Sequence, residues 1–176
     1  MKVLIVFETV EGQTRKVVDF LAKQLRSAGH DLQLLNTEDR LRSLSFNGFD
    51  RAVLAAPVHE RRHPKNFEAF VSANRSELKV RPTLLISVSL KAAFPEGLEE
   101  AQDYVTEMEM RTGFEPSREV LVAGAVRTSS YGYYERQIVQ NVALAGHDIE
   151  LTEGEREFTD WKALGSELEA FLAAKL

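Results

Sequence analysis

The chain has 176 residues, of which 44% are hydrophobic and 28% are charged, with a formal net charge of −5. This balance predicts one domain, residues 1–176, with a substantial core and a soluble surface. The absence of cysteine excludes disulfides, thiolate metal sites and iron–sulfur clusters. The lack of a basic excess argues against a nucleic-acid binder. No apolar run resembles a secretory signal or approaches the ~20 residues that span a bilayer.

The first fifteen residues predict a strand, a tight loop and a helix. The apolar run Val3–Phe7 is followed by the loop Thr9–Thr14 (TVEGQT) and by apolar residues at helical spacing over Lys16–Ala28. Such a loop directs backbone N–H groups and the positive end of the helix dipole at one point, which suits an anion. It is neither a nucleotide P-loop nor GxGxxG, because it has no lysine and one glycine. A neutral, hydroxyl-lined loop suits a phosphate monoester such as that of FMN; the alternative is an ordinary connection with an N-cap threonine.

The remaining elements alternate between strands and helices. The short, partly alternating segment Asp31–Asn36 and the apolar runs in Asp50–Pro57, Thr83–Val88 and Glu119–Val126 predict strands. Amphipathic spacing predicts helices at Asn66–Ala73, Leu98–Arg111 and Asp160–Leu176. We expect connectors at Thr37–Phe49 and Arg75–Val80. The pattern predicts an α/β fold, a flavodoxin-like three-layer sandwich with five parallel strands in the order 2-1-3-4-5.

Three segments remain outside this pattern. The loops Pro57–Pro64 and Ser89–Gly97 follow the third and fourth strands, and the fold brings both to the ligand-binding edge of the sheet beside the first loop. An insertion at about 127–159 separates the fifth strand from the last helix. It opens with tyrosines, continues as a weakly amphipathic segment, Glu135–Ala145, and ends in an acidic run, Glu150–Glu157, which we expect to be solvated surface.

These motifs resemble the flavodoxin-like, menaquinone-dependent protoporphyrinogen oxidases over almost the whole chain. The resemblance is carried by the first loop, by APVHERRHP from Ala56 with FEAF behind it, and by SVSL from Ser87. Its most specific part is AGAVR, ending at Arg127, with YxxYER from Tyr131 and FTDW before the last helix. Ordinary flavodoxins lack such an insertion.

The resemblance implies an FMN-dependent oxidoreductase that converts protoporphyrinogen IX to protoporphyrin IX in haem synthesis and passes electrons to a quinone. The first loop would hold the FMN phosphate, and the loops after strands three and four would flank the flavin ring. The residues expected to bind the cofactor are Thr9, Val10, Glu11, Gly12, Gln13, Thr14, Pro57, Val58, His59, Ser87, Val88, Ser89, Leu90 and Lys91.

Positive side chains near these loops are candidates for binding an anionic substrate. Arg61, Arg62 and Arg127 suit the propionates of a porphyrinogen, and Tyr131 suits a flat aromatic ring. Lys91 suits the region of the flavin that becomes negative on reduction. For each of them an ordinary surface or packing role is the alternative. His59 and His63 lack a third metal ligand, so we expect no metal, and no residue is assigned as a catalytic acid or base.

Two other functions stay open. The chain could be a flavodoxin that only carries electrons between proteins, or a binding module without FMN, because Glu8 and Glu11 place carboxylates beside the phosphate loop. We expect a cytoplasmic protein, with peripheral contact to the cytoplasmic face of the inner membrane as the alternative. The sequence does not specify the oligomeric state.

Overall fold

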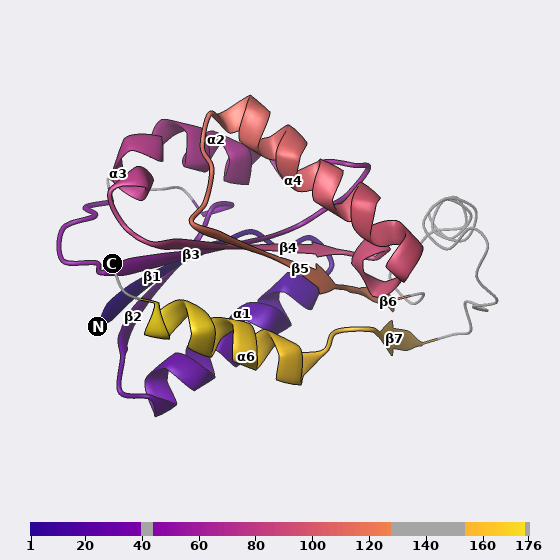
Figure 1. The fold of residues 1–176 in the computed structure, drawn as a ribbon, viewed down its shortest axis with the longest axis horizontal. Helices are drawn as coiled ribbons and strands as arrows, with labels where there is room; N and C mark the ends of the chain where they lie inside the picture. Colours follow the sequence, from indigo (N-terminus) through magenta and orange to yellow (C-terminus); the bar gives the residue numbers. More distant parts are fainter. Residues whose placement is uncertain (40–43, 128–153, 175–176) are drawn as a thin grey trace.

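The computed structural model describes residues 1–39, 44–127 and 154–174. A five-stranded parallel sheet forms its centre, in the order β2-β1-β3-β4-β5, as predicted. Helices α2, α3 and α4 cover one face, and α1 and α6 cover the other (Figure 1). The strands are β1 Lys2–Phe7, β2 Asp31–Asn36, β3 Arg51–Pro57, β4 Thr83–Ser89, β5 Arg118–Ala123, β6 Ala125–Arg127 and β7 Glu155–Glu157. The helices are α1 Gln13–Ser27, α2 Lys65–Ala73, α3 Arg75–Lys79, α4 Leu98–Thr112 and α6 Trp161–Ala173, with short 3-10 turns η1 Lys91–Ala93 and η2 Pro95–Gly97.

Alternation along β1 divides the core between the two faces of the sheet. Ile5 packs with the residues of α1 and α6, whereas Leu4 packs with those of α2 and α4. Strand β3 is buried at every position, as expected for a central strand covered on both sides. The register of β1 with β3 aligns Phe7 with Ala55, so both strands deliver their following loops to the same edge.

Three expectations about the elements were wrong. Helix α1 begins at Gln13 rather than at Lys16, because Gly12 has a left-handed φ of 90° that turns the chain directly into the helix. The segment Arg75–Val80, expected to be a connector, contains the short helix α3. The run Glu119–Val126, expected to be one strand, divides at Gly124 into β5 and β6.

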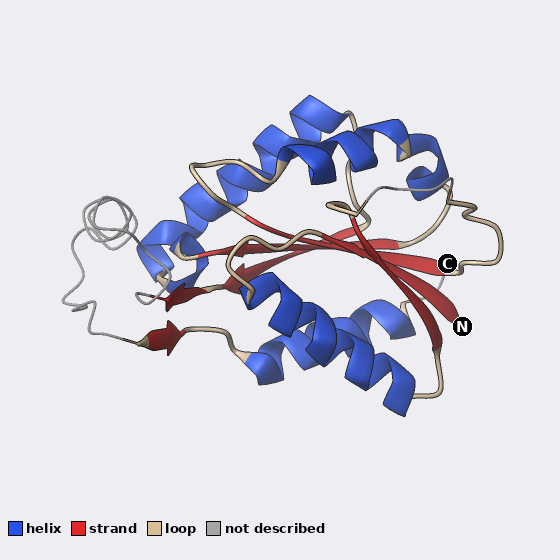
Figure 2. Ribbon diagram, turned by 180° about the vertical axis from the view of Figure 1, so that it is seen from behind, coloured by secondary structure: helices blue, strands red, loops and turns tan. Residues whose placement is uncertain are grey.

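The division at Gly124 creates a second, smaller sheet. Strand β6 leaves the main sheet and pairs antiparallel with β7, with Val126 opposite Arg156. The backbone N–H of Gly124 donates to Ser89 O at 3.0 Å, and its carbonyl accepts from Phe158 N at 3.0 Å. The two-stranded ribbon β6–β7 therefore lies at the two ends of the insertion, beyond the carboxyl ends of β4 and β5 (Figures 1 and 2).

Two further points concern the helices: the start of α6, and whether any helix could cross a bilayer. Asp160 caps α6 by accepting a hydrogen bond from Ala163 N at 2.9 Å. Among residues 1–39, 44–127 and 154–174, the structure has no helix with the length and apolar character required to cross a bilayer.

Candidate functional site

The loop between β1 and α1 has the geometry of an anion site. The Gly12 N–H donates to the Thr9 hydroxyl at 3.1 Å, which closes the loop into a tight turn. The φ of 90° at Gly12 is unfavourable for other residues, and Nη1 of Arg127 lies 2.9 Å from the position that a Cβ there would take. Helix α1 receives no side-chain cap at Gly12, so the first turn of a 15-residue helix faces this loop without a capping acceptor.

Thr14 provides a test of whether a phosphate fits here. Its side chain is 1% exposed, and Oγ1 has no hydrogen-bonding partner among the described residues. A buried hydroxyl without a partner is costly, and natural proteins rarely keep one unless a ligand or water satisfies it. This hydroxyl lies in the first turn of α1, where it would donate a hydrogen bond to a phosphate oxygen. The residues present therefore fit an FMN phosphate.

The carboxylate of Glu8 does not oppose an anion in the way its sequence position suggests. The side chain is 6% exposed, and it accepts a hydrogen bond from the hydroxyl of Thr37, the residue after β2. The Glu8 backbone N–H donates to Ala55 O at 3.1 Å, which fixes the start of the loop against β3. Glu8 is thus a structural residue that joins β1, β2 and β3.

Gln13 connects the loop to the ribbon β6–β7. Its Nε2 donates to Glu157 Oε1 and to Thr159 Oγ1, both at 2.9 Å, and its Oε1 accepts from Nη2 of Arg127 at 2.9 Å. We expected this amide to bind the phosphate, but in the structure these contacts are made to the two strands of the ribbon and to Thr159, two residues beyond β7. The Thr159 hydroxyl donates to Ala123 O at 2.6 Å, which ties the same group to the end of β5.

Charged pairs strengthen this connection. Lys16 Nζ lies 2.7 Å from Glu155 Oε1 and 3.5 Å from Glu157 Oε1. Arg127 Nη2 lies 3.0 Å from Glu155 Oε1, and Nη1 donates to the backbone carbonyl of Glu11. The hydrogen bonds from Arg127 and Lys16 lower the pKa of Glu155 to about 2. Hydrogen bonding from Gln13 is the main cause that lowers the pKa of Glu157.

The sequence prediction missed these partners. The acidic run was expected to be solvated surface, and Glu155 and Glu157 are indeed exposed along β7, yet both carboxylates bind side chains of α1. No local pattern in the sequence indicates these pairs, because the contacts of Glu157 with Gln13 and of Glu155 with Lys16 span 144 and 139 residues.

The loop after β3 forms a tight turn. The backbones of His59 and Arg62 exchange two hydrogen bonds of 2.9 Å, and the two residues between them, Glu60 and Arg61, have φ values of 48° and 65°. Consecutive left-handed residues without glycine are uncommon and cost free energy, so the surrounding contacts hold this turn. Val58 N donates to Val88 O at 2.8 Å, which joins the turn to the end of β4.

A four-residue cluster then fastens this turn to the loop after β4 and to α4. Glu100 on α4 accepts from Arg61 Nη1 at 2.7 Å and from the Tyr104 hydroxyl at 2.6 Å, and lies 3.1 Å from Lys91 Nζ. The hydrogen bond from Tyr104 is the main cause that lowers the pKa of Glu100. Burial, followed by the contact with Glu100, raises the pKa of Tyr104. Arg61 and Lys91 therefore meet at one carboxylate.

Arg62 points to a different partner. Its guanidinium binds Glu68, at 2.7 Å, and Arg111 binds the same carboxylate at 2.8 Å. Burial raises the pKa of Glu68, but the hydrogen bonds from Arg111 and Arg62 outweigh burial and lower it. Arg62 thus anchors the loop to α2 and α4, and its proposed contact with a substrate stays a prediction.

His63 and Ser87 form a buried polar pair beneath the two loops. His63 Nε2 lies 2.9 Å from Ser87 Oγ, and the two side chains are each 1% exposed. Burial lowers the pKa of His63 to about 4, so the ring is neutral near pH 7. The hydroxyl of Ser87, expected near the cofactor, is used by this pair. The next hydroxyl of β4, Ser89 Oγ, accepts from Ala92 N at 3.3 Å and shapes the loop.

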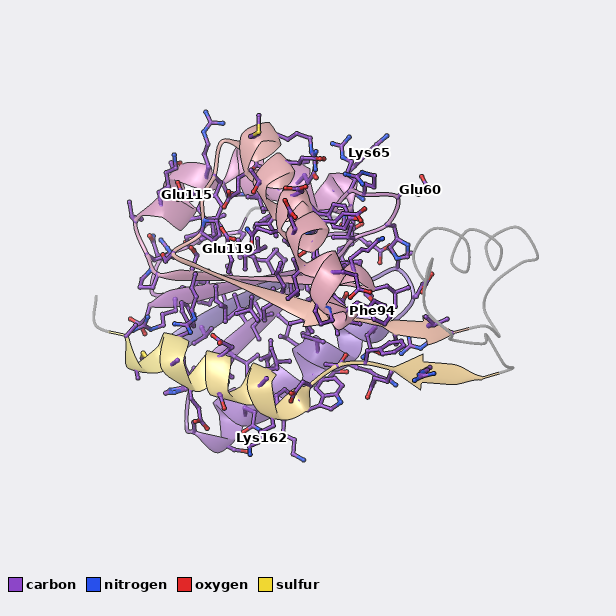
Figure 3. The ribbon with its side chains drawn as sticks, turned by 45° about the vertical axis from the view of Figure 1, so that its right-hand side comes forward. Glu60, Lys65, Phe94, Glu115, Glu119 and Lys162 are labelled. Carbon is purple, nitrogen blue, oxygen red and sulfur yellow. The ribbon has the colours of Figure 1, made fainter. Side chains whose placement is uncertain are left out.

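The predicted site residues therefore lie in two adjoining groups. The first group consists of the loop Thr9–Thr14, which includes Gln13, together with Arg127. The second group consists of the turn after β3 together with Lys91 and Glu100. The ring of Phe94 in the loop after β4 lies 5.7 Å from that of Phe158, which follows β7, and this contact joins the ribbon to the second group. Figure 3 shows Phe94 and Glu60 at the same end of the molecule. Tyr131 lies outside the described residues.

A cavity of about 500 Å³ lies elsewhere, at the end of α4 and the connection to β5. Glu115 and Glu119 mark that region at the opposite side of the molecule from Phe94 (Figure 3). Burial, with the nearby Glu119, raises the pKa of Glu109 in its wall to about 7. Among residues 1–39, 44–127 and 154–174, no cluster of three histidine or acidic side chains is arranged to hold a metal ion.

The five-stranded parallel sheet in the order 2-1-3-4-5 defines a flavodoxin-like protein, and comparison with known proteins supports this class. The family model described as "Flavodoxin domain" matches residues 4–149, so the chain belongs to the flavodoxin-domain family. The sequence is 29% identical over 168 residues to the protoporphyrinogen IX dehydrogenase [quinone] of Escherichia coli K12, covering 94% of this chain and 92% of that protein.

Solved structures agree on the fold. Oxidised flavodoxin 1 from Bacillus cereus superposes with a TM-score of 0.60 at 14% identity, covering 100% of both chains. The FMN-bound flavodoxin of Fusobacterium nucleatum has a TM-score of 0.50 at 13% identity, covering 97% of this chain and 94% of that one. Family membership and the relatives together support an FMN-dependent, flavodoxin-like oxidoreductase.

Proposed function

We propose that this protein uses FMN to oxidise protoporphyrinogen IX to protoporphyrin IX and transfers the electrons to a quinone. The observation that carries the proposal is the alignment with the protoporphyrinogen IX dehydrogenase of E. coli, which covers 94% of this chain. An alignment of that extent includes part of the insertion at about 127–159. Menaquinone as the particular acceptor stays a prediction.

The residues of the first group are suited to holding the cofactor. Thr14 supplies a buried hydroxyl that has no partner among the described residues, and Gly12 lets the backbone approach an anion closely. Of the two carboxylates that were the reason to consider a module without FMN, those of Glu8 and Glu11, the first is bound to Thr37. When bound, FMN supplies two-electron redox chemistry, and the protein supplies position and charge.

The residues of the second group are suited to an anionic substrate. Arg61 has a side chain 59% exposed and lies at the sheet edge beside Lys91, where both cations share the carboxylate of Glu100. A propionate of the porphyrinogen would meet two cations that already bind a carboxylate in this geometry. The complete oxidation removes six electrons and six protons, so three quinones are reduced to quinols for each porphyrin formed.

An anaerobic assay tests this proposal. Protein loaded with FMN is mixed with protoporphyrinogen IX, with and without a soluble menaquinone or ubiquinone analogue, and porphyrin fluorescence is followed. We expect porphyrin to form only with the quinone, at about three quinols per porphyrin. Protein that binds FMN but gives no quinone-dependent fluorescence would instead support a flavodoxin that carries electrons between proteins.

Two matched variants test the substrate contact. Arg61→Gln removes an exposed cation beside the candidate site, whereas Lys79→Gln removes an exposed cation from the far side of the domain, beside the cavity. We expect Arg61→Gln to raise the KM for protoporphyrinogen several-fold with little change in kcat, and Lys79→Gln to change neither. Equal effects of the two variants would remove Arg61 from the substrate site.

A further inference from the structure

The loop between β1 and α1 has no positive side chain of its own to balance the charge of a bound phosphate. A bound phosphate monoester carries up to two negative charges, and Thr9–Thr14 contains no lysine or arginine. Of the two cations that follow in α1, Arg15 pairs with Asp19 at 3.0 Å, and Lys16 pairs with Glu155 at 2.7 Å. A positive group that reaches the loop must therefore come from another element.

Arg127 reaches the loop from β6. Its Nη1 donates to the carbonyl of Glu11 and lies 2.9 Å from the position that a Cβ of Gly12 would take, and its Nη2 donates to Gln13 at 2.9 Å. The side chain is 15% exposed, so the guanidinium is largely shielded from water. A planar guanidinium is well suited to phosphate, because it can present two N–H groups to two oxygens.

Thr14 independently indicates a ligand at the same place. Its buried hydroxyl, in the turn that follows Gly12, has no partner among the described residues, and Arg127 contacts the residues on both sides of Gly12. A phosphate accepting from Thr14 and from the first turn of α1 would lie beside this guanidinium. Arg127 was expected to bind a substrate carboxylate, and its position at the loop indicates a different anion.

We infer that Arg127, held at one end of the insertion, binds the phosphate of FMN together with Thr14 and the first turn of α1, and that Glu155 pairs with the same guanidinium when no phosphate is bound. This inference rests on the proposed binding of FMN at this loop. Glu155 shares its carboxylate between Arg127 and Lys16, so Lys16 remains as its partner when Arg127 turns toward a phosphate. Glu155 therefore competes with the phosphate for Arg127.

The test is equilibrium binding of FMN and of riboflavin to the apoprotein, measured by quenching of flavin fluorescence. Riboflavin has the same ring system without the phosphate, so it reports the ring site and the folded state in each variant. We expect Arg127→Gln to weaken FMN binding by about 10- to 100-fold, the usual effect of losing a hydrogen bond to a charged group, and to leave riboflavin binding unchanged. Arg127→Lys should fall between wild type and Arg127→Gln.

Two further variants separate a phosphate contact from a structural role. Glu155→Gln removes the competing carboxylate, so FMN should bind a few-fold more tightly than to wild type. Arg156→Gln removes an exposed cation from the same ribbon, one that lies over the Phe158 ring instead of the loop, and should leave both affinities unchanged.

The outcomes are distinguishable. Wild-type protein that binds neither flavin would refute the proposed function itself. Tight FMN binding by wild type, with Arg127→Gln weakening FMN and riboflavin equally, would overturn the inference, because Arg127 would then only support the fold. Weaker FMN binding in both Arg127→Gln and Glu155→Gln would overturn it too, because the pair would then act only by holding the ribbon in place.

Discussion

Replacing Thr14 by valine should stabilise the empty protein while weakening its binding of FMN. Valine has nearly the shape of threonine and lacks the hydroxyl, and the Thr14 hydroxyl is buried with no partner in the part of the chain that the structure describes. Removing an unpaired buried polar group recovers part of its desolvation cost, about 1 kcal/mol in the free energy of unfolding. In the complex the same hydroxyl would donate to a charged phosphate, a contact worth about 1.5–3 kcal/mol, or roughly 10- to 100-fold in Kd.

Urea denaturation of the apoprotein and fluorescence titration with FMN measure the two effects. Thr112→Val is the matched control, because Thr112 is also buried in a helix, but its hydroxyl donates to Met108 O at 2.8 Å, far from the loop. The control should lose stability and keep its affinity for FMN. A Thr14→Val apoprotein less stable than wild type, with FMN affinity unchanged, would refute the assignment of this hydroxyl to a ligand.

Two predictions concern pH. Burial lowers the pKa of His63 to about 4, so the unfolded chain takes up a proton first as pH falls, and the stability present above pH 6.5 is lost toward pH 4. Between pH 7.5 and 4.5 wild type should lose about 2–3 kcal/mol more unfolding free energy than His63→Gln in urea titrations; equal losses would contradict the buried neutral ring. Burial and Glu119 raise the pKa of Glu109 to about 7. The folded state therefore favours the protonated side chain, and the stability that this protonation contributes is lost as pH rises through 7. The melting temperature of Glu109→Gln should therefore exceed that of wild type at pH 8 but not at pH 4.5. The control Glu169→Gln, at an exposed position of α6, should melt no higher than wild type at either pH. An equal gain in melting temperature for Glu109→Gln at both pH values would exclude titration of Glu109 as the cause.

The main sheet was predictable because most of its strands contain an apolar run, and β2 shows partial alternation of apolar and polar residues. The run in β3 is buried at every position, and such runs between helical segments specify a parallel, doubly wound sheet. The break at Gly124 was not predictable, since VLVAGAV is continuous in apolar character. The partner that draws β6 away is β7, which begins at Glu155, 28 residues beyond Arg127.

The site was predictable to the extent that it is local. The loop between β1 and α1 carries its glycine and threonines within six residues, and the structure places them together. The contacts of Gln13 with Glu157 and Thr159 span 144 and 146 residues, and no periodic pattern indicates such pairs. The same holds for Arg61 and Glu100, which are joined only when the turn after β3 folds against α4.

A crystal structure of the protein with FMN bound would test the central claim most directly. We predict that the FMN phosphate lies at the N-terminus of α1, within hydrogen-bonding distance of the Thr14 hydroxyl, with the ring between the loops after β3 and β4. A phosphate located elsewhere, with Thr14 still buried and without a partner, would contradict the account.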